Sequence, residues 1–217
     1  MQFKAIIFDC DGVIVDTETI SNNIIQSKLA QLGLILSDQK VQTLFTGFTT
    51  KQNLITASDL LNKELPANFE FELKSAYLEE MKQNLEVIQG VPELIYNLSP
   101  ALAMATNAQR ADMEFKLTKL GLTDVFKHRF CVDDVNHPKP APDLYQLASQ
   151  SLNIHPKDCL VIEDSLAGIK AGHDAGMTVF AYSQKMDANS QLKAGASQCF
   201  NSLSELQHHL NQLNLYR

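Results

Sequence analysis

The sequence lacks the features that mark several large classes of protein. It has no tryptophan, and its four cysteines lie too far apart for a C-x-x-C pair, so neither a zinc site nor a disulfide framework is expected. It has no excess of positive charge: 18 Lys and Arg against 25 Asp and Glu give a net charge of −7, which argues against nucleic acid and anionic membranes as partners. No run approaches the roughly 18 apolar residues of a membrane span, and the short apolar opening does not resemble a signal peptide. We expect a cytoplasmic protein.

The composition is that of a globular protein. Hydrophobic residues make up 45% of the 217 positions and charged residues 20%, with nine glycines and seven prolines. These proportions exclude collagen-like, disordered and coiled-coil chains. The length allows one ordinary domain and a smaller second one.

Short apolar runs that alternate with helical patterns predict the main fold. Each run is typical of a buried strand, and the alternation with helices favours an α/β fold with a Rossmann-like parallel sheet covered on both faces. The runs are Lys4–Phe8, Ala101–Ala105, Arg129–Val132, Cys159–Ile162 and Thr178–Tyr182.

The stretch from residue 16 to residue 88 differs, because it contains helical stripes of apolar residues and no convincing strand. Seventy residues are too many for one crossover connection, so we expect a separate α-helical domain inserted after the first strand. The α/β core would then consist of residues 1–15 and 89–217, and the helical domain of residues 16–88.

Acidic residues follow two of the predicted strands. Asp9 and Asp11 come after the first strand, and Glu163 and Asp164 follow the run that ends at Ile162. Each pair alone is also typical of a turn or a helix cap. If the two strands are neighbours, however, the four carboxylates meet where open α/β sheets bind ligands. Such a group calls for a hard cation with oxygen ligands, for which Mg²⁺ is the natural choice.

Other polar residues are expected at the same edge. Thr106 and Asn107 end the second run, and Lys139 is held between prolines in the segment H-P-K-P-A-P-D. The four carboxylates, this lysine and a divalent cation sum to a charge of −1. A cation, a lysine, a hydroxyl and backbone N–H groups together stabilise negative oxygens, as phosphoryl transfer requires.

Four motifs in order resemble the haloacid dehalogenase superfamily of phosphotransferases. They are D-C-D-G-V at residues 9–13, T-N at 106–107, K-P-A-P-D at 139–143 and E-D-S-L-A-G at 163–168. The resemblance covers essentially the whole chain, and the helical insertion resembles the cap domain of that family. The subgroup that the chain resembles most is the β-phosphoglucomutase-like phosphatases.

The resemblance implies a role for each motif residue. Asp9 is the implied nucleophile, which forms an aspartyl-phosphate. Asp11 is the implied acid and then base, a role typically worth ~10²–10⁴-fold in rate. Thr106 and the backbone of Asn107 would hold the transferring phosphoryl group, and Lys139 would steady both that group and Asp9.

The resemblance also implies a ligand set for Mg²⁺. Asp9, the backbone carbonyl of Asp11 and Asp164 would bind the cation, with Glu163 close by or acting through water. In the alternative dehalogenating branch no acid is needed for the leaving group, so the presence of Asp11 argues against that branch.

Two positions in the helical insertion separate phosphatases from mutases. Ser21 stands where the mutase carries a histidine, and Thr50 stands where it carries an arginine that would hold a second phosphate. Hydrolysis is therefore favoured over transfer within a sugar. Gly47, Thr49 and Lys51 are further candidates for contact with the substrate, although a polar loop between helices would look the same.

The sequence therefore predicts a monomeric, Mg²⁺-dependent phosphatase that acts on a small phosphate ester, such as a sugar, sugar-acid or polyol phosphate. A phosphomutase of the β-phosphoglucomutase type is the alternative within the same class. A signalling receiver domain is a remote alternative, because it also gathers acidic residues, a threonine and a lysine around Mg²⁺, but in a chain of about half this length.

Overall fold

The computed structural model describes residues 3–46, 48, 50–183 and 186–217. Contacts along the chain divide it into two units. The α/β unit comprises Met1–Val15 and Glu86–Arg217, and the helical unit comprises Asp16–Leu85. Gly47 and Thr49, two of the candidate substrate contacts, lie outside the described residues.

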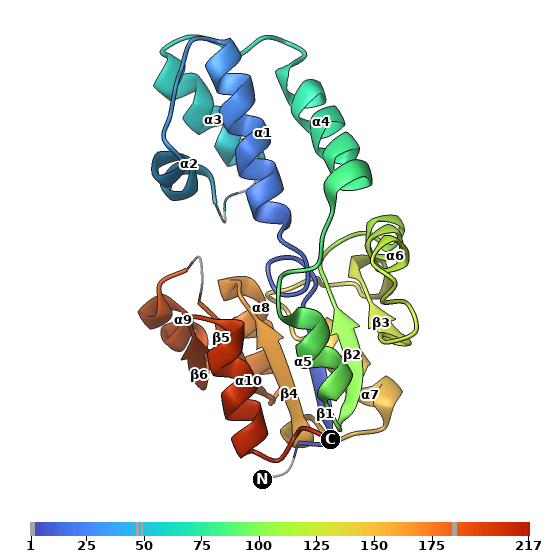
Figure 1. Cartoon of the computed structure of the whole chain (residues 1–217). Helices are drawn as coiled ribbons and strands as arrows, with labels where there is room; N and C mark the ends of the chain where they lie inside the picture. Colours follow the sequence, from blue (N-terminus) through green and yellow to red (C-terminus); the bar gives the residue numbers. More distant parts are fainter. Residues whose placement is uncertain (1–2, 47, 49, 184–185) are drawn as a thin grey trace. The chain divides into compact units, whose positions relative to one another are not determined.

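The α/β unit is built on a parallel six-stranded sheet with the order β3-β2-β1-β4-β5-β6 (Figure 1). All five strands expected from the sequence are present, with small shifts at their ends. The sixth, β6, was not expected, because three residues at a sheet edge are too few to form a recognisable pattern. The strands are β1 (Ala5–Phe8), β2 (Ala101–Ala105), β3 (His128–Phe130), β4 (Cys159–Glu163), β5 (Thr178–Tyr182) and β6 (Gln198–Phe200).

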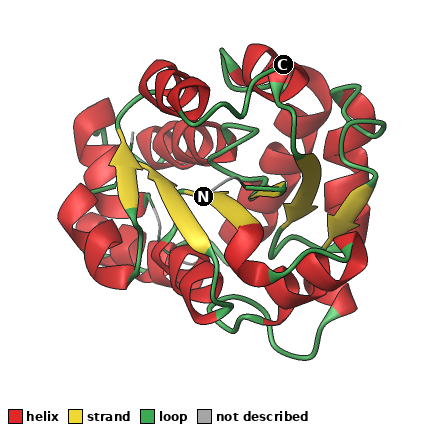
Figure 2. Cartoon of the chain, turned by 90° about the horizontal axis from the view of Figure 1, so that it is seen from below, coloured by secondary structure: helices red, strands yellow, loops and turns green. Residues whose placement is uncertain are grey.

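Helices lie on both sides of the strands (Figure 2). α7 packs on β1, β2 and β3, and α8 packs on β4 and β5, while α10 contacts β6 and α5. This confirms the expected α/β class. The helices are α5 (Val91–Asn97), α6 (Arg110–Lys119), α7 (Asp143–Leu152), α8 (Leu166–Asp174), α9 (Ala188–Ala194) and α10 (Leu203–Gln212).

The central strand β1 sets the position of the polar residues at the sheet edge. All four of its residues are buried, as expected for a strand covered on both faces. Phe8, its last residue, pairs with Met104 of β2 and with Ile162 of β4. The residues that follow Phe8, Met104 and Ile162 therefore lie side by side at the carboxyl edge of the sheet.

The described residues of the helical unit form four helices, α1 (Thr17–Gln31), α2 (Asp38–Phe45), α3 (Thr50–Leu61) and α4 (Phe69–Asn84). Asp16 begins the first of them by accepting a hydrogen bond from the Thr19 N–H, the expected use of an aspartate at a helix start. The apolar side chains of the unit form a small core of their own, and its described residues contain no strand. No helix in the described part of the chain is both long and apolar enough to span a membrane.

Candidate active site

The polar residues that follow β1, β2 and β4 meet at the carboxyl edge of the sheet. Asp9 comes directly after β1, and its N–H donates to the Ile162 carbonyl of β4. Thr106 follows β2, and Glu163 ends β4. The condition on which the sequence argument depended, that the first strand neighbours the strand before Glu163, is met.

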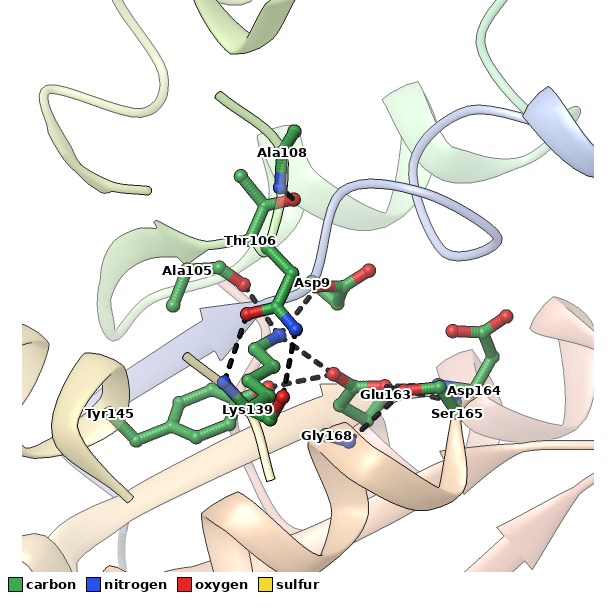
Figure 3. A network of polar contacts seen from close by, with 11 residues as sticks. Asp9, Ala105, Thr106, Ala108, Lys139, Tyr145, Glu163, Asp164, Ser165 and Gly168 are labelled. Atoms are coloured by element: carbon green, nitrogen blue, oxygen red, sulfur yellow. Dashed lines mark hydrogen bonds and ion pairs between the residues drawn. The ribbon is translucent and has the colours of Figure 1, made fainter. Parts of the chain in front are cut away.

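Lys139 connects these strand ends (Figure 3). Its buried ammonium donates to Asp9 Oδ1 at 2.6 Å, to the Ala105 carbonyl at 2.7 Å and to Glu163 Oε1 at 2.7 Å. Asn107 holds the backbone of the lysine on both sides: it accepts from the Lys139 N–H at 2.9 Å and donates to the Lys139 carbonyl at 3.0 Å. The lysine is thus fixed by its side chain and by its main chain.

Glu163 is fully buried and uses both oxygens within the protein. Oε1 accepts from Lys139 and, at 3.0 Å, from the Tyr145 hydroxyl. Oε2 accepts from the backbone N–H groups of Asp164 and Ser165, each at 2.9 Å, and from the Ser165 hydroxyl at 3.0 Å. A carboxylate with five donors is held in one orientation. The Glu163 carboxylate also lies close against Gly168 in the first turn of α8, where a Cβ would be 1.5 Å from Oε1.

Burial dominates the electrostatics of Asp9. Loss of hydration raises the pKa of its carboxyl to about 7, Lys139 opposes this shift, and Glu163 and Asp11 add to it. Burial also acts on Lys139 and by itself would lower its pKa, but the carboxylates of Asp9 and Glu163 raise the pKa well above its usual value. The lysine therefore stays charged, and the carboxylates of Asp9 and Glu163 that contact it outnumber its one positive charge.

A divalent cation fits this surplus of carboxylates. Asp9, Glu163 and Asp164 each offer an oxygen, and these three atoms lie within 4.8 Å of one another. Because the oxygens of Glu163 already accept five hydrogen bonds, Asp9 and Asp164 are the better ligands, and Glu163 instead orients the residues around them. Carboxylate oxygens are the donors that Mg²⁺ prefers. Gly12 leaves the space for Asp164, since a Cβ there would lie 2.0 Å from its Oδ2.

A buried glutamine, which sequence reasoning did not single out, holds the backbone at Asp164. Gln191 in α9 is fully buried, and its Nε2 donates to the Asp164 carbonyl at 2.7 Å and to the Tyr182 carbonyl at 3.2 Å. Its Oε1 accepts from the Ser183 hydroxyl. This side chain ties the turn after β4 to the end of β5.

Asp11 has a partner that the sequence argument also missed. Lys116 in α6 donates to Asp11 Oδ1 at 2.7 Å and lies 2.6 Å from Asp112 Oδ2. The charges predicted from the sequence included neither this cation nor the Asp112 carboxylate beside it, and the two cancel in the sum. Sequence spacing gives no sign of the pair, because Lys116 lies 105 residues from Asp11.

Of the other candidate residues, Thr106 and Asn107 lie at the same edge of the sheet, and Lys51 lies in the helical unit. Thr106 is buried, and its hydroxyl accepts from the Ala108 N–H at 3.1 Å, so that its own proton remains for another acceptor. Asn107 was predicted to act through its backbone, and its side chain has the additional task of holding Lys139. Lys51 is exposed in α3 of the helical unit.

The helical unit contains a cavity of about 510 Å³ between α1, α3 and α4. Ser21 and Thr50, the two positions at which the resemblance predicts a difference from mutases, line it, and Lys51 is not among its lining residues. Most of the other lining side chains are polar or charged, and Lys74 is the only cation among them in the described residues. The lining residues are Thr17, Glu18, Ser21, Ile24, Ile25, Thr50, Asn53, Glu70, Leu73, Lys74 and Tyr77.

Comparison with known families gives one extensive match. The model of the family described as haloacid dehalogenase-like hydrolase matches residues 6–182. This range contains all four motifs and the whole helical unit.

Curated relatives and a solved structure agree with this match. The 6-phosphogluconate phosphatase of Escherichia coli is 27% identical over 83% of each chain. The fructose-1-phosphate phosphatase of the same species is 30% identical over 81% of this chain and 94% of its own. A hydrolase of this family from Deinococcus radiodurans, solved with bound phosphate and sodium, is 32% identical with a TM-score of 0.89 over 99% of this chain and 97% of its own.

Proposed function

The chain belongs to the haloacid dehalogenase-like hydrolases, and from this premise we propose that it is a Mg²⁺-dependent phosphatase of a small phosphorylated metabolite. The observation that carries the proposal is the buried group of Asp9, Lys139 and Glu163, in which one lysine contacts both carboxylates. The named phosphatases among its relatives support the reaction class. The length of the match and the helical unit argue against the receiver-domain alternative.

The reaction is a double displacement at phosphorus. A carboxylate oxygen of Asp9 attacks the phosphorus atom, the bond from phosphorus to the ester oxygen breaks, and Asp11 gives its proton to the departing alcohol. Asp11 then takes a proton from water, which attacks the aspartyl-phosphate and releases inorganic phosphate and free Asp9. When bound by Asp9, Asp164 and the Asp11 carbonyl, Mg²⁺ supplies positive charge to the phosphoryl oxygens.

The remaining residues position the phosphoryl group and the nucleophile. Lys139 neutralises charge on the phosphoryl oxygens while it holds Asp9, and the proton of the Thr106 hydroxyl and the N–H of Asn107 donate to the same oxygens. Glu163 keeps the lysine in place. Since these groups are already fixed by hydrogen bonds, little reorganisation is needed when the charge develops.

We propose that the helical insertion, residues 16–88, is the cap that selects the substrate. Its cavity supports this role, because the hydroxyl and amide side chains in the lining suit a hydroxylated leaving group. With Ser21 and Thr50 in the lining, the cavity lacks the histidine and arginine of the mutase pattern. This favours hydrolysis over the alternative, a phosphomutase.

The test is release of inorganic phosphate from a panel of sugar, sugar-acid and polyol phosphates, with Mg²⁺ and with EDTA. We expect turnover of at least one ester, with loss of activity in EDTA. Addition of a sugar bisphosphate tests the mutase alternative, which predicts an isomeric sugar phosphate and no net release. Pure protein that is inactive on the whole panel and on an aryl phosphate would contradict the proposal.

A further inference from the structure

Lys116 is a buried lysine beside a proposed catalytic residue. It is 1% exposed, and its ammonium contacts Asp11 on the turn after β1 and Asp112 on its own helix. Burial alone would lower the pKa of Lys116, but Asp11, Cys10 and Asp112 raise it above its usual range. The side chain is therefore a permanent cation and a hydrogen-bond donor.

A local helix pair does not explain this burial. Lys170 and Asp174 in α8 have the same four-residue spacing and a distance of 2.7 Å, yet the Lys170 side chain is 58% exposed. Such pairs contribute little to stability on the surface, and lysine is almost never fully buried unless it is paired. The contact between Lys116 and Asp112 would form on the surface equally well. What burial adds is the contact with Asp11, across 105 residues of sequence.

From this contact we infer that Lys116 is a positioning residue for proton transfer by Asp11. The inference rests on the proposed function. The Asp11 side chain is one-third exposed and precedes Gly12, whose φ of +80° marks a turn rather than a regular element. A carboxyl at such a place has several accessible orientations, and a donor fixed inside the protein selects among them. The ammonium therefore holds the carboxyl of Asp11 through Oδ1, and this fixes the direction from which the acid meets the ester oxygen.

The way in which kcat/KM depends on the leaving group distinguishes a positioning role of Lys116 from a merely structural one. An alkyl alcohol departs with difficulty unless it receives a proton, whereas an aryl alcohol departs well without one. Because kcat/KM includes the steps up to departure of the alcohol, a misplaced acid lowers it selectively for alkyl phosphates. A loss of fold or of phosphoryl binding lowers it equally for both classes.

The experiment measures kcat/KM of Lys116→Met with the alkyl phosphate that is turned over best and with p-nitrophenyl phosphate. We expect a loss of about 10- to 100-fold for the alkyl ester, part of the full contribution of a general acid, and less than about 3-fold for the aryl ester. Lys170→Met is the matched control, since it removes an exposed lysine from an equivalent helix pair, and both rates should stay unchanged.

A double-mutant cycle with Asp11→Asn tests the route of the effect. If Lys116 acts through Asp11, Lys116→Met causes no further loss once Asp11→Asn is present. Thermal unfolding confirms that each variant is folded. Should Lys116→Met not fold, Lys116→Gln takes its place. Its shorter, uncharged side chain does not reach Asp11 Oδ1 as the ammonium does, so the same selective loss for the alkyl ester is expected.

Three results would overturn the inference. Equal losses for both esters, a gain in rate, or an additive loss in the Asp11→Asn background would each show that Lys116 does not position the acid. Wild-type protein without activity on any ester would instead contradict the proposed function. The two failures are therefore distinguishable.

Discussion

The two units of the molecule treat their polar residues in opposite ways. In the α/β unit, Asp9, Lys139 and Glu163 are buried and bonded to one another. In the helical unit, polar residues instead line a cavity. Buried charges are costly unless they are held in good geometry. The α/β unit therefore suits a fixed arrangement of charged groups, and the cavity of the helical unit suits side chains that can be substituted.

This difference explains how one fold can combine constant chemistry with variable substrates. Phosphoryl transfer needs groups that are in place before the charge develops, and the hydrogen bonds around Glu163 provide that order. Selection of a leaving group needs only contacts that can change from one protein to another. Substitutions in one unit should therefore affect phosphoryl transfer, and substitutions in the other should affect selection of the leaving group.

The largest expected effect is that of Asp9→Asn. The amide keeps the shape of the side chain but is a poor nucleophile, so kcat should fall by a factor on the order of 10⁴ to 10⁶ for every ester on the panel. The measurement is steady-state phosphate release, with mass spectrometry of the acid-quenched protein to detect the aspartyl-phosphate in wild type. If Asp9→Asn keeps most of its activity, the nucleophile is another residue, and the chemistry does not depend on the buried group of the α/β unit.

The site was largely predictable because a parallel sheet brings distant sequence segments to one edge. Asp9 and Glu163 were expected to lie close together if β1 and β4 were neighbours, and only the structure shows that they are. Lys116 and Gln191 were not predictable, because each lies on a helix with no neighbouring motif, and only packing shows what it contacts. The five bonds of Glu163 were likewise invisible, so its expected place near the cation did not reveal that its oxygens are occupied.

The helical unit shows a different limit of sequence reasoning. The apolar stripes were sufficient to predict helices, because a period of 3.6 residues is a strong signal. They did not predict which polar residues line the cavity. Thr50 and Asn53 line it while Lys51 does not, although all three are polar and lie in the same helix.

A second prediction concerns Gln191, which holds the backbone carbonyl of Asp164. Gln191→Leu keeps the volume but removes both donors, so the turn after β4 loses its tie to α9. We expect Mg²⁺ to bind about 10- to 100-fold more weakly, the usual effect of removing a group behind a metal ligand. Isothermal titration with Mg²⁺ and no substrate measures this directly.

The matched control for that prediction is Ser183→Ala. It removes the bond to Gln191 Oε1 but leaves the amide that holds the Asp164 carbonyl. Its affinity for Mg²⁺ should stay close to that of wild type. If both variants lose affinity equally, the effect is a general loosening of the α/β unit, and if neither does, Gln191 only supports the fold.

The smallest expected effect lies in the helical unit and compares two lysines. Lys74 lines the cavity and Lys51 does not, so Lys74→Met should lower kcat/KM for sugar-acid phosphates relative to neutral sugar phosphates, and Lys51→Met should not. One lost bond to a charged group contributes about 1.5–3 kcal/mol, a factor on the order of tenfold or more. Both variants should keep the Mg²⁺ affinity of wild type. Greater selectivity change in Lys51→Met would place substrate recognition outside this cavity, while a loss of kcat on every ester would show that the helical unit takes part in the chemistry as well.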